Sequence, residues 1–71
     1  MARQPIHERV KGHVELAGIT HAELAAKTGW DEQRVYRVLA GKTRLTAADM
    51  ELLAKILEKP VASLYREARA S

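Results

Sequence analysis

Cysteine and phenylalanine are absent from this chain of 71 residues, and aromatic residues make up only 4% of it. Without cysteine the chain cannot be a disulfide scaffold, and it offers neither thiolates to a zinc ion nor a thiol nucleophile. A reducing compartment suits this composition, so we expect the protein in the cytoplasm. The sequence has no apolar run near the roughly 20 residues of a membrane helix, so no membrane association is expected.

Catalytic and metal-binding patterns are missing as well. A helical metal site typically has two histidines four residues apart beside a set of carboxylates. The histidines His7, His13 and His21 do not have this spacing. Ser63 and Ser71 lie far from any histidine in the sequence and outside a glycine elbow. We therefore expect no enzyme, no metal and no cofactor.

Length and apolar content limit the possible architecture. With 46% hydrophobic residues, the chain has room for one core, near the lower limit for folding without metal or disulfides. It contains no repeats and no strand-like alternation of apolar and polar residues. We expect residues 1–71 to form one all-α domain, with residues 1–4 as a loose arm and no second domain to bind a small-molecule effector.

Apolar spacing predicts five helices. Pro5 suits a first helical position, Gly18 suits a helix end, and Pro60 ends the fourth helix at Lys59. The expected core stripes are Ile6, Val10, Val14 and Ala17, then Leu24 and Ala25, then Val35, Val38 and Leu39, and then Met50, Leu53, Ala54 and Leu57. The fifth helix has an apolar stripe of Val61, Leu64, Tyr65 and Ala68, which is wider than one short helix needs for docking on its own core. On the first helix, the side with His7, Arg9, Lys11 and Glu15 is expected to face solvent.

The stretch from Thr20 to Gly41 predicts two short helices joined by a glycine turn. Thr20 and Glu23 have the spacing of a capping box, which Thr46 and Asp49 repeat before the fourth helix. Asp31 is a good N-cap for the second of the two helices. A helix, a short turn containing glycine and a second helix with polar residues facing out form a helix-turn-helix, whose second helix commonly enters the DNA major groove.

The net charge of +3 is concentrated in this part of the chain. Residues 1–26 and residues 45–71 each carry equal numbers of acidic and basic side chains. The excess therefore lies in residues 27–44, where Lys27, Arg34, Arg37, Lys42 and Arg44 outweigh Asp31 and Glu32. Such a basic region is typical of phosphate binding, although a solvated basic face without a partner has the same composition.

These segments resemble the XRE/Cro-like helix-turn-helix family, which includes phage repressors and many small bacterial regulators. The resemblance covers about residues 6–65. It is carried by Gly18-Ile19-Thr20, Ala22-Glu23-Leu24-Ala25, Thr28-Gly29, Val35 and Leu39-Ala40-Gly41-Lys42, with Leu53-Ala54 and residues 61–64 at the positions of the last two helices. It implies a five-helix, phage-repressor-like domain that binds double-stranded DNA.

By this resemblance, Glu32, Gln33 and Arg37 occupy base-reading positions. Glutamine can pair bidentately with adenine, arginine with guanine, and a carboxylate can accept from cytosine. Glu32 has an alternative role beside Asp31, as a charge that complements the helix dipole. The expected contacts to the DNA backbone are His21, Arg34, Tyr36, Lys42, Thr43 and Arg44. Trp30 is interpreted as a core residue, with stacking on a base as the alternative.

The sequence therefore predicts a sequence-specific transcription regulator of a bacterial cell, encoded by the bacterium or by a phage. We expect a repressor, of the immunity or Cro-like type, that acts by occupying its operator. The alternative is an antitoxin or another protein-interaction module on the same fold. A homodimer is expected through the C-terminal helix, with Tyr65 and Leu64 in the contact, unless the whole stripe of that helix is core.

Overall fold

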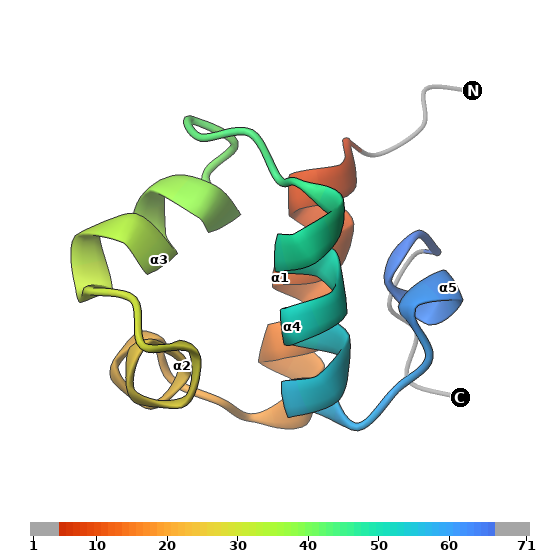
Figure 1. The fold of residues 1–71 in the computed structure, drawn as a ribbon, viewed down its shortest axis with the longest axis horizontal. Coiled ribbons are helices and arrows are strands. Elements are labelled where there is room, and N and C mark those ends of the chain that lie inside the picture. Colours follow the sequence, from red (N-terminus) through yellow and green to blue (C-terminus); the bar gives the residue numbers. More distant parts are fainter. Residues whose placement is uncertain (1–4, 67–71) are drawn as a thin grey trace.

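A computed structural model describes residues 5–66, which form five α-helices and no strand (Figure 1). The helices are α1 (Ile6–Ala17), α2 (His21–Thr28), α3 (Glu32–Leu39), α4 (Ala47–Leu57) and α5 (Val61–Leu64). The predicted all-α fold with five helices is confirmed. The expected arm at residues 1–4 and Ala68, the last residue of the expected C-terminal stripe, lie outside the described residues.

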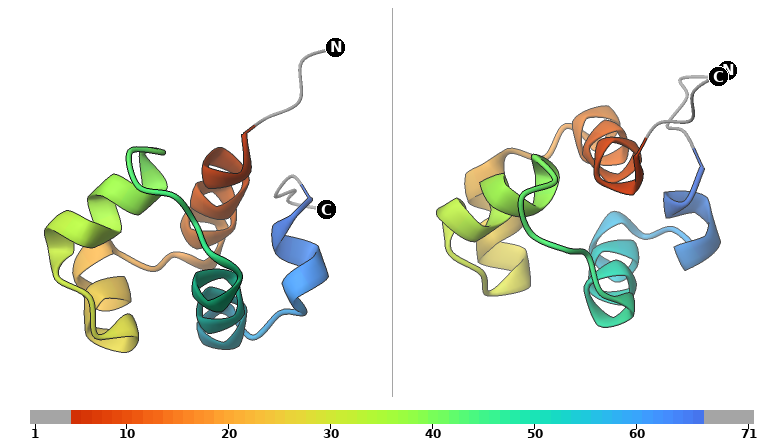
Figure 2. Two further views of the ribbon diagram at one scale, coloured as in Figure 1. Left: turned by 45° about the horizontal axis from the view of Figure 1, so that its top comes forward. Right: turned by 90° about the horizontal axis from the view of Figure 1, so that it is seen from above.

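The helices form three groups around one core. α1 and α4 pack together in the middle, α2 and α3 cover one flank, and α5 covers the other (Figures 1 and 2). α3 contacts α1 and α2, and α5 contacts α1 and α4. Within residues 5–66, every helix is too short or too polar to cross a bilayer.

Capping residues begin the helices where the sequence predicts. The Thr20 hydroxyl accepts from the amide of Glu23 at 3.1 Å, while the Thr20 amide donates to the Glu23 carboxylate at 3.0 Å. Thr46 and Asp49 form the same reciprocal pair at the start of α4. Both pairs satisfy amides that would otherwise lack partners in a first helical turn.

The buried residues agree closely with the predicted stripes. The fully or nearly fully buried apolar side chains are Val10, Val14, Leu24, Ala25, Val35, Val38, Leu39, Met50, Leu53, Ala54, Leu57 and Leu64. Ala17 is exposed, contrary to expectation. It is the last residue of α1, and the chain turns back after Gly18 so that Ile19 packs against the core instead.

The C-terminal end of α5 is fixed to α1 by side chains that the sequence placed in solvent or left unassigned. His13 is only 5% exposed, and its Nε2 donates to the carbonyl of Arg66 at 3.0 Å. Lys59 Nζ lies 3.1 Å from His13 Nδ1 and can donate to it, so the two ring nitrogens of His13 connect α1 to Lys59 and to Arg66. Arg9 is partly buried and donates to the carbonyl of Tyr65.

Leu64 and Tyr65 differ in exposure. Leu64 is 0% exposed, so it belongs to the core and has no surface to offer a second subunit. Tyr65 follows the last residue of α5 and is 49% exposed. The expectation that both residues form an intersubunit contact is therefore wrong for Leu64, because a helix of four residues needs this side chain to attach it to α1 and α4.

His7 packs against the end of α3. Gly41 has a left-handed backbone with φ of 80°, its amide donates to Val38, and the amide of Lys42 donates to Arg37. A Cβ atom on Gly41 would stand 2.5 Å from Cε1 of the His7 ring. His7 is therefore partly buried rather than solvated, and the start of α1 is packed onto the turn that ends α3.

Replacing Leu64 with alanine should lower the free energy of unfolding by about 2 to 5 kcal/mol, because it leaves a cavity beneath α5. The matched control is Leu16→Ala, since Leu16 is 48% exposed and should lose far less. Urea unfolding measures both. Equal losses would mean that α5 does not close the core.

Replacing Gly41 with alanine should destabilise the fold more than the same change at Gly18. Both glycines have a positive φ, so both variants incur the backbone cost of roughly 1 to 2 kcal/mol. A Cβ on Gly18 meets nothing within 4 Å, whereas one on Gly41 meets the His7 ring. Thermal unfolding measures the stability lost in each variant. Adding His7→Ala to Gly41→Ala should reduce the extra loss at Gly41, because the ring that the new Cβ meets is then removed. Equal losses would show that the His7 ring moves aside without cost.

Candidate nucleic-acid interface

The turn between α2 and α3 is held by a backbone hydrogen bond of Gly29 and by the side chain of Thr28. Gly29 is left-handed, and its amide donates to Ala25 at 2.9 Å. The Thr28 hydroxyl donates to the carbonyl of Leu24 at 2.8 Å and accepts from the amide of Trp30 at 3.2 Å. These bonds give the two helices a defined relative orientation.

The starts of α2 and α3 are fixed by carboxylates. Asp31 accepts from the amide of Arg34 at 2.7 Å and caps α3. At the start of α2, hydrogen bonds from the backbone and side chain of Thr20 hold the pKa of the Glu23 carboxyl below its ordinary value, with a further contribution from the charge of Lys27. The Glu23 cap therefore stabilises α2 at neutral pH and is lost as the pH falls through this lowered pKa.

α3 has an apolar side and a polar side. Val35, Val38 and Leu39 are 0 to 3% exposed and attach the helix to the core. The remaining side chains of α3 are exposed, as the sequence predicted. Because the buried side of α3 is fixed against the core, the side opposite to it, with Gln33 and Arg37, faces solvent.

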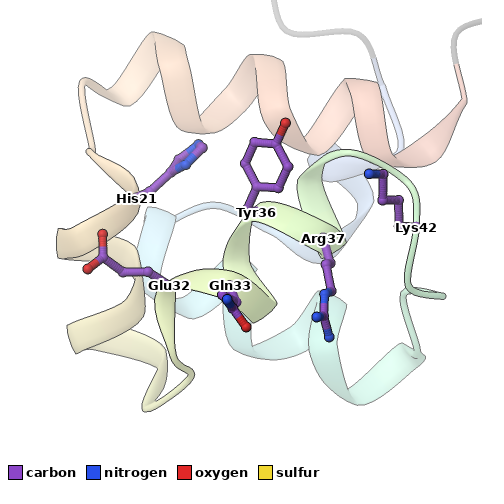
Figure 3. A pocket seen from close by; sticks show the side chains of 6 residues that line it. All are labelled: His21, Glu32, Gln33, Tyr36, Arg37 and Lys42. Carbon is purple, nitrogen blue, oxygen red and sulfur yellow. The ribbon is translucent and has the colours of Figure 1, made fainter.

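Six side chains line one open concave surface (Figure 3). They come from the start of α2, from the outer side of α3 and from the loop after α3. They are His21, Glu32, Gln33, Tyr36, Arg37 and Lys42. All six are among the side chains predicted from the sequence to contact DNA, including every predicted base reader.

His21 and Tyr36 form the side of this surface nearest α1. Their rings meet edge to face, with centroids 6.2 Å apart, and Tyr36 is 57% exposed. In Figure 3 the Tyr36 hydroxyl points away from the ends of Gln33 and Arg37. The aromatic pair therefore lies beside the polar ends of Gln33 and Arg37 and leaves them accessible.

Charge is distributed unevenly over the concave surface. Glu32 lies at the end near α2, and it is the one acidic side chain among the six. Arg37 and Lys42 lie toward the other end, where the loop leaves α3 (Figure 3). The surface is therefore positively charged at its Arg37–Lys42 end and presents a hydrogen-bond acceptor at its other end.

Three predicted DNA contacts lie outside the concave surface. Thr43 and Arg44 are exposed in the loop after α3. The Arg34 side chain is directed elsewhere: its guanidinium carbon is 4.7 Å from the centre of the Trp30 ring, and a terminal nitrogen is 3.6 Å from Asp49. Trp30 is partly buried and packs against the core, as its first interpretation predicted.

Sequence reasoning missed two arrangements around this surface. The packing of His7 on Gly41 joins residues far apart in the chain, and no local signal indicates it. The contact of Arg34 with Trp30 does have a signal, since the residues are four apart at the start of a helix. Residues 5–66 contain no cluster of His, Cys, Asp and Glu suited to a metal ion.

Comparison with known proteins identifies the family. A family model described as Helix-turn-helix matches residues 14–64, from the end of α1 to the last residue of α5. No curated protein and no solved structure matched the chain. The match covers most of the chain, including both helices and the turn that form the concave surface. The chain therefore belongs to the XRE/Cro-like helix-turn-helix family of DNA-binding regulators.

Proposed function

We propose that this protein binds a specific site in double-stranded DNA and represses transcription by occupying that site. The observation that carries the proposal is that Gln33, Arg37 and Lys42 all line one open surface of a family helix-turn-helix. Two of these side chains can read base edges, and the third can neutralise a phosphate. Occupancy of an operator requires nothing further from the protein.

Base reading is assigned to the outer side of α3. Gln33 and Arg37 stand four residues apart, so they are separated by about 6 Å along the helix axis. This exceeds the rise of roughly 3.4 Å per base pair, so each side chain can address a different pair. Gln33 suits adenine, Arg37 suits guanine, and Glu32 can accept from cytosine.

The remaining residues of the surface and its loop are assigned to the DNA backbone. His21 and Tyr36 lie beside the base-reading side chains, and Lys42 begins the loop after α3. Thr43 and Arg44 follow in the same loop and are exposed. Contacts from these five residues would position α3 in the groove, because phosphate contacts fix register without reading sequence.

Two copies of the protein are proposed to bind one operator. A single small module buries only about 600 to 1,000 Å² on DNA, which is little for tight specific binding. Tyr65 is half exposed at the end of α5, on the flank opposite α2 and α3, and can contact a second copy there. Paired α3 helices should then lie about 34 to 36 Å apart, one turn of DNA.

Selection of bound sites from random duplex DNA tests the proposed function. Gln33→Ala and Arg37→Ala should each weaken binding to the selected site by about 1 to 3 kcal/mol and change random DNA much less, because a base contact is lost. Lys55→Ala, on α4, is the control for loss of an exposed charge away from α3. Fluorescence titration measures the affinities.

Three outcomes would each contradict part of the proposed function. Equal weakening on selected and random DNA would show that Gln33 and Arg37 do not read bases. Failure to enrich any site would overturn specific DNA binding itself. Placing the selected site across a reporter promoter should lower expression, and increased expression would show activation instead of repression.

Tyr65→Ala should weaken binding to an inverted repeat by about tenfold or more while leaving a single half-site unaffected, because only the paired complex gains from joining two modules. Titrations on both DNAs measure this, with Lys55→Ala as the control. Sedimentation should give two proteins per repeat. One protein per DNA, with a footprint over one half-site, would instead establish a monomeric regulator.

A further inference from the structure

Arg34 connects three parts of the fold outside the concave surface. Its guanidinium lies over Trp30, which belongs to the turn between α2 and α3, at 4.7 Å from the ring centre. The same guanidinium is 3.6 Å from Oδ1 of Asp49, in the first turn of α4. This is the one salt bridge found within residues 5–66.

Asp49 is well placed to anchor such a connection. Its other carboxylate oxygen, Oδ2, accepts from the amide of Thr46 at 3.2 Å, so the carboxylate is held by the cap of α4. The Asp49 side chain is 13% exposed, against 51% for that of Arg34. Arg34 therefore reaches from an exposed position on α3 to a fixed and largely covered acceptor on a core helix.

The connection bridges two helices whose backbones do not pack together. α3 packs against α1 and α2, and α4 packs against α1, α2 and α5, but α3 and α4 are not in backbone contact. The chain between them is the loop with Lys42, Thr43 and Arg44. Side chains must therefore supply any direct restraint between the outer part of α3 and the start of α4.

We propose that Trp30, Arg34 and Asp49 form a clamp that fixes the orientation of α3, and that Arg34 is a positioning residue for base reading. This inference rests on the proposed function and assigns Arg34 a role other than binding phosphate. Arg34 follows Gln33 directly in the chain, so restraint at Arg34 limits the movement of a base-reading side chain. Base contacts need their groups held within about 0.5 Å, whereas contacts with phosphate tolerate more displacement.

The clamp and a simple charge effect predict opposite results at Asp49. Removing a negative charge near DNA should strengthen binding if only the field of the protein matters. Removing the acceptor of the clamp should weaken binding to the specific site, because α3 loses its restraint. Substitution of Arg34 distinguishes a clamp from a phosphate contact. Loss of a phosphate contact lowers the slope of log affinity against log salt concentration by about one, whereas loss of the clamp leaves that slope unchanged.

The test compares Asp49→Asn with Asp31→Asn on the selected DNA site. Both changes remove one negative charge, and asparagine can still accept the capping hydrogen bond at either position. Asp49→Asn should bind the selected site about tenfold more weakly, with random DNA and the salt slope unchanged. Asp31→Asn should bind no more weakly than the unaltered protein. Similar behaviour of the two variants would overturn the clamp.

Substitution of Arg34 provides a second measurement. Arg34→Lys keeps the charge but lacks the flat guanidinium that stacks on Trp30, so it should also lose specific affinity. Combining it with Asp49→Asn should add little further loss, because both changes break one unit. If Arg34→Lys kept its full affinity for the selected site, the stacked guanidinium would not be needed and the clamp would be overturned. A lower salt slope for Arg34→Gln would show that Arg34 contacts phosphate, which would also overturn the clamp.

The free protein offers a readout that does not depend on DNA. Trp30 is the sole tryptophan of the chain, so its fluorescence reports on the cation above its ring. Arg34→Lys and Asp49→Asn should shift the emission, whereas Asp31→Asn should not. If no DNA site is enriched, the proposed function fails, and the emission still decides whether the clamp forms. If a site is enriched but the emission is unchanged in all variants, the clamp alone is wrong.

Discussion

Burial of the inner side of α3 is the constraint on which the rest of this structure depends. Val35, Val38 and Leu39 are removed from water against α1 and α2, and a helix fixed on that side has one possible outer side. Gln33 and Arg37 are exposed because their neighbours are buried. The same apolar contacts that stabilise the domain therefore determine which side chains of α3 are exposed and available to a partner.

Local signals made most of the fold predictable from the sequence. Thr20, Asp31 and Thr46 each cap a helix through hydrogen bonds within three residues, so neighbouring sequence alone determines where α2, α3 and α4 begin. The predicted core stripes agree with the buried residues for the same reason, because the period of a helix relates sequence spacing to a face. The position of α3 then determines which side chains line the concave surface, and the family match covers both helices that supply most of them.

The features that could not be predicted depend on residues distant in the chain. His7 packs on Gly41, Arg34 pairs with Asp49, and His13 bonds to Arg66, and none of these contacts leaves a periodic trace. The exposure of Leu64 and Tyr65 is a related case. Both are apolar neighbours at the end of a very short helix, so only the docking of α5 decides that Leu64 is buried while Tyr65 remains half exposed.

The modest charge of the protein is consistent with a division between affinity and specificity. A net charge of +3 gives a limited attraction to DNA, and Glu32 weakens it further at the end of the concave surface near α2. Under the proposed function, discrimination between sites would then come from well-placed hydrogen bonds, which contribute only when the donors and acceptors are held in position. A weakly basic surface gains relatively little on random DNA, so the proposed restraint of α3 would increase the ratio of specific to non-specific binding even where it adds little stability.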